Sequence, residues 1–460
     1  MRNVVLFVLD SVRKDVFDEV AVRLRSRADV EYEQCRAASS WSVPSHASLF
    51  TGELPSEHGV HTYARHYTNV SDDDTFLSRM PDHRTVGVSA NVFAGDDFGF
   101  DGLFDDFVGI SSNRRFPSGI DVSNFGRECE YNGIRKHLAF AVASAKHEHP
   151  VRSFLNGVHV TLDDLSKQLP VKKPFDRGCR AVERSIRKRT LGGGSREPFF
   201  LFANFMDAHG PLTPMRGFDN EYFDTPSTWK SEDVDWDAEA KKEQSDEIER
   251  YVGLYRAAVD YLDRRLSRLI DDIQKATSEP TTFVVSADHG ENLGGPVDDY
   301  LFEHSDCSLS EGLLHVPALI IDSPEGPAPR TDRYVSHRDF GTLLAGLSVG
   351  DIPDISAERI AAERIGNNRP NSDEERLARC VYHDGFKDYW DSKGRVARYR
   401  IHADVPSHQE LLEDIPSIAD LEAELFGEDI ETAHERARTR RSDSEITVAT
   451  EEKLKGLGYL

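Results

Sequence analysis

The sequence lacks the features that mark disulfide-bonded, secreted and membrane-spanning proteins. Its five cysteines lie far apart among 460 residues and form no C-x-x-C pair, which favours reduced thiols over a disulfide framework or a thiolate zinc site. No apolar run approaches the roughly 18 residues that a membrane span needs. The first apolar run ends at Asp10 with no small-residue cleavage site after it, so we expect no signal peptide and a cytoplasmic location.

Positive charge is also scarce. The chain has 56 basic and 81 acidic residues, which gives a net charge of −25, and the acidic excess is spread along its length. Nucleic acids and anionic membranes are bound by basic surface, so the overall charge argues against both as partners. Two interpretations stay open: an ordinary acidic protein, or a haloarchaeal-like protein whose acidic surface stays hydrated in strong salt.

Apolar residues gather in strand-like runs. The strongest runs are NVVLFVL at residues 3–9, FFLFANF at 199–205 and TTFVVS at 281–286, and they are typical of parallel strands buried on both faces. Weaker candidate strands span residues 84–90 and 316–321, and helical spacing of apolar residues over 247–275 predicts a long helix. This alternation predicts an α/β fold with a large, mostly parallel sheet that is sandwiched by helices.

The pattern divides the chain into a catalytic domain, residues 1–365, and a C-terminal subdomain, residues 366–460. Within the first, residues from about 125 to 196 are helical in pattern and locally basic, and they end in Gly-Gly-Gly-Ser, which predicts a helical insertion with a flexible end. Within the second, short alternating runs over residues 379–402 predict a small antiparallel sheet, followed by helix and a tail.

Polar residues follow two of the predicted strands, at the edge where α/β enzymes place their sites. Asp10 follows the first strand, and Asp288 and His289 follow the strand at residues 281–286. These side chains can converge on one divalent cation, and a mixed oxygen and nitrogen set suits Zn or Mn, whereas pure oxygen sites favour Ca or Mg. Taken singly, each residue could equally serve as a helix cap or a turn residue.

Ser42 stands at a predicted helix start, just before Pro44 and Ser45. Its hydroxyl would lie near the positive end of that helix, and a metal beside it would lower the hydroxyl pKa and create a nucleophile. The combination indicates transfer of an anionic, tetrahedral group to Ser42 and then to water. Ser-x-Pro-Ser alone is also a common helix start.

The order of these segments resembles the sulfatase family of the alkaline-phosphatase superfamily over roughly the whole chain. That family has a first strand ending in Asp, a Cys/Ser-x-Pro-Ser-Arg signature followed by Thr-Gly, a central His segment and a late Asp-His segment. The similar stretches here are LFVLDSVRKD, SVPSHASLFTG, LPSEHGV, FANFMDAHGPL, SADHGENLG, EHSDCSLSEGLLHVPALII and GLGYL. The resemblance implies an alkaline-phosphatase-like fold.

The resemblance also implies a site around one divalent cation, which could be Ca, Mn, Mg or Zn. Asp10, Asp288 and His289 would bind this cation. Ser42 would be a further metal ligand and either the nucleophile or the precursor of the nucleophile.

Four more residues receive roles from the resemblance. His209 and His304 would contact the transferred group or the leaving group, one of them as general acid. His46 stands in the catalytic signature where the family has Arg, and the resemblance therefore implies a catalytic role for it. Asn91 falls near a Lys-x-His segment of the family and would bind substrate.

Two departures from the family pattern bear on the chemistry. Ser11 replaces the second of two Asp residues that are common after the first strand, which removes a carboxylate and moves the preference away from Ca. Sulfatases convert the signature Cys or Ser into formylglycine, and the converting enzyme reads the signature Arg, which is His46 here. The sequence therefore favours an unmodified Ser42 over formylglycine.

Three functions remain in competition. The first is hydrolysis of a sulfate ester of a small molecule or glycan. The second is hydrolysis of a phosphate or phosphonate ester, or phosphoryl transfer, by an unmodified Ser42. The third is a non-catalytic protein that kept the fold, and the presence of Asp10, Asp288, His289 and Ser42 argues against it.

If the acidic surface is halophilic, stability should depend on salt. With a net charge of −25, like charges repel over about 10 Å or more at low ionic strength. We expect partial unfolding or loss of activity below roughly 1 M salt, measured by circular dichroism across a salt series. Full stability in dilute buffer would contradict a halophilic origin.

Overall fold

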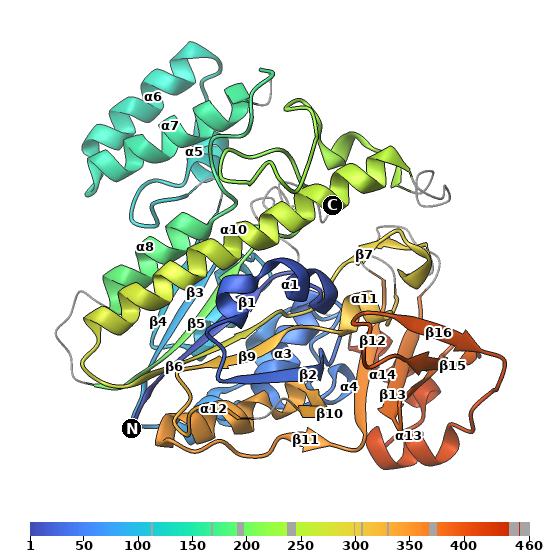
Figure 1. Ribbon diagram of the computed structural model, residues 1–460. Coiled ribbons are helices and arrows are strands. Elements are labelled where there is room, and N and C mark those ends of the chain that lie inside the picture. The colour runs from blue at the N-terminus through green and yellow to red at the C-terminus, as the bar shows by residue number, and fades with distance from the viewer. Residues whose placement is uncertain are drawn as a thin grey trace.

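The computed structural model describes most of the chain (Figure 1). The described residues are 1–111, 114–166, 169–190, 197–236, 245–298, 300–304, 307–328, 331–367, 375–440 and 450. The predicted flexible end at residues 192–195 and the tail at 451–460 lie outside them.

A nine-stranded mixed sheet forms the centre of the molecule, in the order β11-β10-β2-β9-β6-β1-β5-β3-β4. Its strands are β1 (Asn3–Leu9), β2 (Val30–Arg36), β3 (Arg84–Ser89), β4 (Asp106–Gly109), β5 (Phe199–Phe205), β6 (Thr281–Ser286), β9 (Ala318–Ile321), β10 (Thr331–Ser336) and β11 (Ser356–Ala357). The five strands from β6 to β4 are parallel neighbours. The predicted class is confirmed, although β9 lies antiparallel to both β2 and β6.

Helices cover both faces of this sheet. On one face α8 packs on β3 and β5, and the long helix α10 contacts α1, α2 and α8. Helix α12 packs on β1 and α3. The helices are α1 (Lys14–Val20), α2 (Val22–Arg25), α3 (Ser42–Thr51), α4 (Pro55–His58), α5 (Val122–Glu128), α6 (Ile134–Lys146), α7 (Pro150–Ser166), α8 (Cys179–Thr190), α10 (Asp246–Ala276), α11 (Glu311–Leu314), α12 (Phe340–Val349), α13 (Ala419–Leu425) and α14 (Ile430–Thr439). None of the described helices is both long enough and apolar enough to cross a membrane.

The centre of the sheet fixes where the site forms. The side chains of β1 are apolar except at Asn3, half of the apolar ones are valine, and every residue of the strand is buried. This suits a strand with neighbours on both sides and helices on both faces. β1 pairs in parallel with β5 and β6, with Leu6 opposite Phe202 and Val284. Their carboxyl ends therefore meet at one edge, where the backbone N–H of Asp10 donates a hydrogen bond to the carbonyl oxygen of Phe205 at 2.9 Å.

The predicted insertion consists of two structurally different parts. Figure 1 shows α5, α6 and α7 standing away from the sheet, whereas α8 lies against it. Residues such as Val182 and Ile186 on α8 are fully buried, so this helix is part of the body. Only the stretch that contains α5 to α7 forms a separate lobe.

A second, five-stranded antiparallel sheet forms the C-terminal region, in the order β12-β13-β14-β15-β16. Its strands are β12 (Ile360–Ile365), β13 (Leu377–His383), β14 (Phe386–Asp391), β15 (Val396–Ile401) and β16 (Gln409–Leu412). The predicted small antiparallel sheet is present, and it includes β12, which precedes residue 366. A separate short hairpin joins β7 (Asn292–Leu293) to β8 (Phe302–Glu303).

The two large sheets are joined through a buried carboxylate. Glu311 of α11 is fully buried, with Arg36 Nη2 of β2 at 2.9 Å from Oε2 and Lys387 Nζ of β14 at 3.3 Å from Oε1. The Tyr382 hydroxyl of β13 donates to the same Oε1. One negative charge thus holds two buried positive charges that come from different sheets.

Replacing Glu311 by Gln should be strongly destabilising, because it keeps the shape but leaves Arg36 and Lys387 buried without a counter-charge. A loss of about 3–5 kcal/mol in the free energy of unfolding is expected, as for other broken buried pairs, measured by chemical denaturation at fixed salt. The matched control is Asp354→Ala, which removes the exposed pair with Arg333 and should cost less than about 1 kcal/mol. Equal effects of the two changes would contradict this account of the joint between the sheets.

Candidate metal centre and nucleophile site

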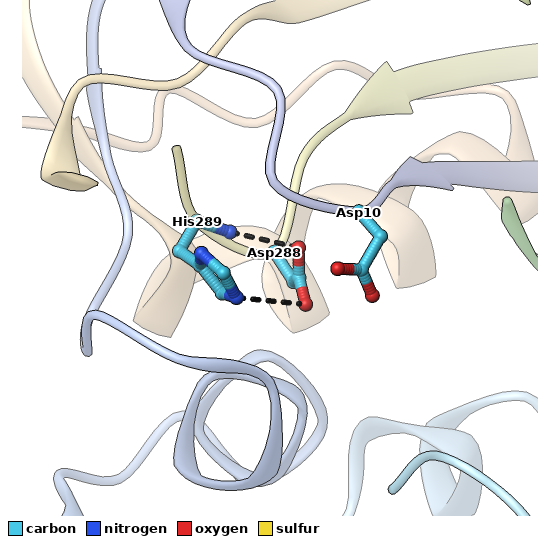
Figure 2. Close-up of side chains that lie close together, drawn as sticks. All are labelled: Asp10, Asp288 and His289. Atoms are coloured by element: carbon cyan, nitrogen blue, oxygen red, sulfur yellow. Dashed lines mark hydrogen bonds and ion pairs between the residues drawn. The ribbon is translucent and has the colours of Figure 1, made fainter. Parts of the chain in front are cut away.

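Three of the predicted metal ligands come together at the carboxyl edge of the sheet. Asp10, Asp288 and His289 offer ligand atoms that all lie within 4.8 Å of one another, and all three residues are fully buried. Figure 2 shows the two carboxylates and the imidazole converging from separate chain segments, the end of β1 and the end of β6. The strand-end argument from the sequence predicted this arrangement.

Hydrogen bonds orient the acceptor atoms of these residues toward one another. The backbone N–H groups of Ser11 and His289 both donate to Asp288 Oδ1, at 3.2 and 2.9 Å. His289 Nδ1 lies 2.7 Å from the carbonyl oxygen of Gly290, which can only accept, so Nδ1 carries the proton and Nε2 presents a lone pair. That lone pair lies 3.6 Å from Asp288 Oδ2, so two acceptors face each other without a hydrogen to share.

The ionised form of the two carboxylates is unfavourable in this buried site when no cation is beside them. Burial, and then the charge of Asp288, raise the pKa of Asp10 to about 6. Burial also raises the pKa of Asp288 to about 6, although the Ser42 hydroxyl and the two backbone donors act in the opposite direction. Burial and the neighbouring His304 lower the pKa of His289 to about 3, so the imidazole stays neutral and available as a ligand.

Amide side chains from neighbouring strands fix Asp10. Asn91, which follows β3, donates from Nδ2 to Asp10 Oδ2 at 2.5 Å, and Asn204 of β5 reaches the same oxygen at 3.4 Å. Asn91 was predicted to contact substrate, and the structure shows it bound to a metal-ligand candidate. Asn204 was not predicted, although it is the single polar residue in the run FFLFANF.

Ser42 begins α3 directly beside the three ligands. Its Oγ lies 3.4 Å from His289 Nε2, and the residue is fully buried. The helix starts after Trp41, tolerates Pro44 in its first turn, and ends at Gly52, whose φ of 79° is left-handed. The hydroxyl therefore sits at the positive end of a helix, as the sequence predicted.

His46 lies one turn further along α3 and packs as a structural residue. Its Nδ1 is 2.7 Å from the carbonyl oxygen of Ser42, and its Nε2 is 3.3 Å from Asn204 Nδ2. Its ring meets Phe100 and Phe202 edge to face. Burial lowers the pKa of His46, so a neutral ring bridges the first turn of α3 to β5.

The two other predicted histidines join the same cluster. The ring of His304 lies 4.6 Å from that of His289 and 5.1 Å from that of His209, between ring centroids. Glu291 orients His304, with Oε1 at 3.0 Å from Nδ1. Burial lowers the pKa of His304 to about 4, and burial with the neighbouring His304 lowers that of His209 well below its usual range.

Arg364 is a site residue that the sequence did not reveal. It belongs to β12 of the second sheet and is fully buried. Its Nη1 lies 3.4 Å from Ser40 Oγ and its Nη2 lies 3.5 Å from the carbonyl oxygen of His304. The second sheet thus places a positive charge next to Ser40 and His304.

A cavity of about 500 Å³ lies beside this cluster at the same sheet edge. Its walls come from α7, from the turn after β3 and from the loop after β5, with charged groups that include Arg115, Asp176 and Arg177. Arg177 donates to the carbonyl oxygens of His209 and Pro211, both at 2.6 Å. The guanidinium of Arg177 therefore connects the wall of the cavity to the backbone of His209.

A second cluster of carboxylates, away from this site, is part of an ion-pair network and is not a metal-site candidate. Asp18, Glu31 and Glu33 also bring carboxylate oxygens together. The buried Lys14 Nζ lies 2.6 Å from Asp18, 3.0 Å from Glu33 and 3.4 Å from Glu31, so an ammonium already supplies the positive charge.

Comparisons with known proteins bear on the family and the fold of this chain. The sulfatase family model matches residues 187–350. The protein named uncharacterized sulfatase YidJ, from Escherichia coli K12, is 24% identical over 219 residues, which cover 45% of this chain and 43% of that protein. The aligned part therefore spans less than half of that relative.

Solved structures share the fold over nearly the whole chain. The phosphonate monoester hydrolase SpPMH from Silicibacter pomeroyi has a TM-score of 0.58 at 14% identity and 97% coverage of both chains. BT4656, solved with its substrate D-glucosamine-2-N,6-O-disulfate, has a TM-score of 0.57 at 13% identity, covering 96% of this chain and 99% of its own. These similarities do not test the predicted haloarchaeal-like origin, which stays a prediction. The family match over residues 187–350 and the shared alkaline-phosphatase-like fold make the chain similar to the sulfatase family of the alkaline-phosphatase superfamily.

Proposed function

We propose that this protein hydrolyses sulfate esters of a small molecule or glycan, with Ser42 as the nucleophile. The observation that carries the proposal is the position of Ser42 Oγ, buried and 3.4 Å from His289 Nε2. One side of the site is formed by the candidate metal ligands Asp10, Asp288 and His289. The other side is formed by His304, His209 and Arg364. The substrate class is supported by BT4656, whose own substrate is a sulfated sugar.

The residues present fit a bound divalent cation. His289 Nε2 and Asp288 Oδ2 are acceptors that face each other at 3.6 Å, and a cation satisfies both, together with Asp10. Oxygen and nitrogen ligands in this mixture suit Zn or Mn better than Ca. When bound, such an ion supplies positive charge that lowers the pKa of a neighbouring hydroxyl and attracts an anionic substrate.

The nucleophilic attack and the proton transfer are assigned to different residues of the chain. Ser42 Oγ forms a bond to sulfur while the bond from sulfur to the ester oxygen breaks, and water later releases sulfate from the covalent adduct. The proton that Ser42 loses is balanced by the proton that the leaving oxygen gains. His304 and His209 are placed to deliver that proton, because an anionic ester beside them favours the imidazolium form.

Two further groups act on substrate binding and on position. Arg364 supplies a fixed positive charge next to His304, where the oxygens of the transferred group would lie. His46, predicted as catalytic, ties the carbonyl of Ser42 to β5 through Asn204, so we assign it a positioning role.

The second candidate is hydrolysis of phosphate or phosphonate esters, or phosphoryl transfer. The observation that favours it is His46, which occupies the place of the signature Arg, so that Ser42 stays a hydroxyl. A phosphorylated serine is cleaved by direct attack of water, whereas a sulfated serine is harder to cleave in this way. The buried, convergent ligands support either enzyme over a non-catalytic member of the fold.

Removing one metal ligand should remove the metal. In Asp288→Ala the bound ion and the activity are lost, and so is the metal-dependent gain in thermal stability, because a ligand stabilises only the state that binds it. That gain is about 2.7 kcal/mol at a free metal concentration near 100 times Kd. Elemental analysis and melting curves with and without chelator measure both effects.

Glu33→Ala is the control for this experiment, because it removes a carboxylate from the network around Lys14. It should leave metal content unchanged. Metal retained by Asp288→Ala, together with activity, would show that the site is assigned to the wrong residues.

The nucleophile is tested by Ser42→Ala. We expect a loss of at least about 10³-fold in kcat, because the covalent route disappears while the other groups remain. Ser45→Ala is the matched control: its hydroxyl donates to the carbonyl of Ser39 at 2.8 Å, away from the ligands, and activity should persist.

The chemical state of Ser42 is read from the mass of its peptide, alongside assays on matched aryl sulfate and aryl phosphate substrates. An unmodified serine should give detectable turnover of the aryl phosphate. A peptide lighter by two hydrogens, with turnover of sulfate alone, would overturn the unmodified serine and establish formylglycine.

A further inference from the structure

The large cavity beside the site is shared between the body and the helical lobe. Its volume of about 500 Å³ lies within the range of roughly 300–1,000 Å³ that is usual for pockets enclosing small organic ligands. Its wall includes Ala90 and Val92, on either side of Asn91, and Pro211, which follows His209 by two residues. The cavity therefore borders two of the segments that carry site residues.

Helix α7 of the lobe forms part of the cavity wall and is held in place by the body. Asn156 of α7 donates to the carbonyl oxygens of Phe116 and Ile120 at 3.1 and 3.0 Å. The guanidinium carbon of Arg184, on α8, lies 4.5 Å from the centroid of the Phe116 ring. The position of α7 is thus fixed while it contributes five residues to the wall: His159, Val160, Asp163, Asp164 and Ser166.

Every basic side chain among the described wall residues already has an acceptor. Arg177 donates to two backbone carbonyl oxygens, those of His209 and Pro211. The other three each pair with a carboxylate of the same wall: Arg115 with Asp176 at 2.9 Å, Lys173 with Asp163 at 3.5 Å and Lys230 with Glu232 at 3.6 Å.

The described wall carries no surplus of positive charge. Asp164 and Asp207 also line the cavity, which makes four basic and five acidic residues, a net charge of −1 when all are ionised. Burial, and then the charge of Asp176, raise the pKa of Asp207 to about 7, so this carboxyl carries part of a charge near neutral pH. A second anionic group on a ligand would lose hydration in the cavity without gaining a surplus cation.

The uncharged part of the wall suits a ring that carries hydroxyl groups. Val160 and Trp229 supply apolar surface, and the indole N–H of Trp229 donates to Glu247, which fixes the plane of the ring. A sugar has apolar C–H faces for such surface and a rim of hydroxyls for polar groups. Five hydroxyl side chains line the cavity: Ser111, Ser166, Thr213, Ser227 and Thr228.

We propose that this cavity binds the alcohol part of the ester and selects an uncharged sugar ring over one that bears a second anionic group, with α7 as a specificity element. The inference rests on the proposed function, since it concerns the organic part of the same substrate. Asp163 has the central role, because it neutralises Lys173, the basic side chain that would otherwise attract a second anion.

Calorimetry on the full chain with its metal bound measures this preference without turnover. The probes are N-acetylglucosamine 6-sulfate and glucosamine 2-N,6-O-disulfate, which share the ring and the ester and differ by a second negative charge. The unmodified protein should bind the first at least about tenfold more tightly, because like charges in a partly enclosed site repel. Equal binding, tighter binding of the disulfate, or no binding of the first probe would overturn the proposal.

Asp163→Asn keeps the shape of the side chain and removes the charge paired with Lys173. The affinity for the disulfate, relative to the uncharged ester, should rise about three- to tenfold. Glu148→Gln is the matched control, since it makes the same charge change on the same lobe at an exposed residue outside the cavity wall, and it should leave the ratio unchanged. The same ratio in Asp163→Asn as in the unmodified protein, or the same shift in both variants, would count against the role of α7.

Turnover of the aryl esters, measured in parallel, separates this inference from the proposed function. Protein that hydrolyses an aryl ester but shows no preference between the two sugars would contradict the cavity assignment alone. Protein that prefers the uncharged sugar but hydrolyses neither aryl ester would contradict the proposed hydrolysis and leave the cavity as a sugar-binding site.

Discussion

The site rests on one electrostatic constraint: two carboxylates and an imidazole lone pair are held together away from water. Asp10, Asp288 and His289 are fully buried, and burial disfavours the ionised carboxylates. Such an arrangement is stable in a folded protein when a cation shares the acceptors or when the groups bind protons instead. The orientation of Asp288 Oδ2 and His289 Nε2 toward the same point suits the first of these arrangements.

Residues from several neighbouring elements hold the two buried carboxylates in place through hydrogen bonds. Asn91 after β3 and Asn204 of β5 hold Asp10, and the backbone of Ser11 holds Asp288. Neutral amide donors orient a carboxylate without neutralising it, so the charge stays available for an ion. The parallel pairing of β1 with β5 and β6 is therefore a functional feature, because it brings these segments to the same edge.

The sequence predicts the part of the site that depends on strand ends and leaves out the part that depends on docking between sheets. Asp10, Ser42, Asp288 and His289 could be found because each follows or begins a regular element with a recognisable pattern. Arg364 could not, because β12 is far away in the chain and only the joint between the two sheets brings it to His304. The change of role for Asn91 has the same origin: its position near the site was predictable, but its bond to Asp10 depends on side-chain geometry.

The joint between the sheets is consequently part of the site. Glu311 links Arg36 of the large sheet to Lys387 of the second sheet, and β12 of that second sheet carries Arg364. A buried ion pair is a costly way to gain stability, but it accepts few alternative arrangements. A network of this kind fixes the register of one sheet against the other. The contact that we propose between Arg364 and an anionic ester would depend on that register more than on additional stability.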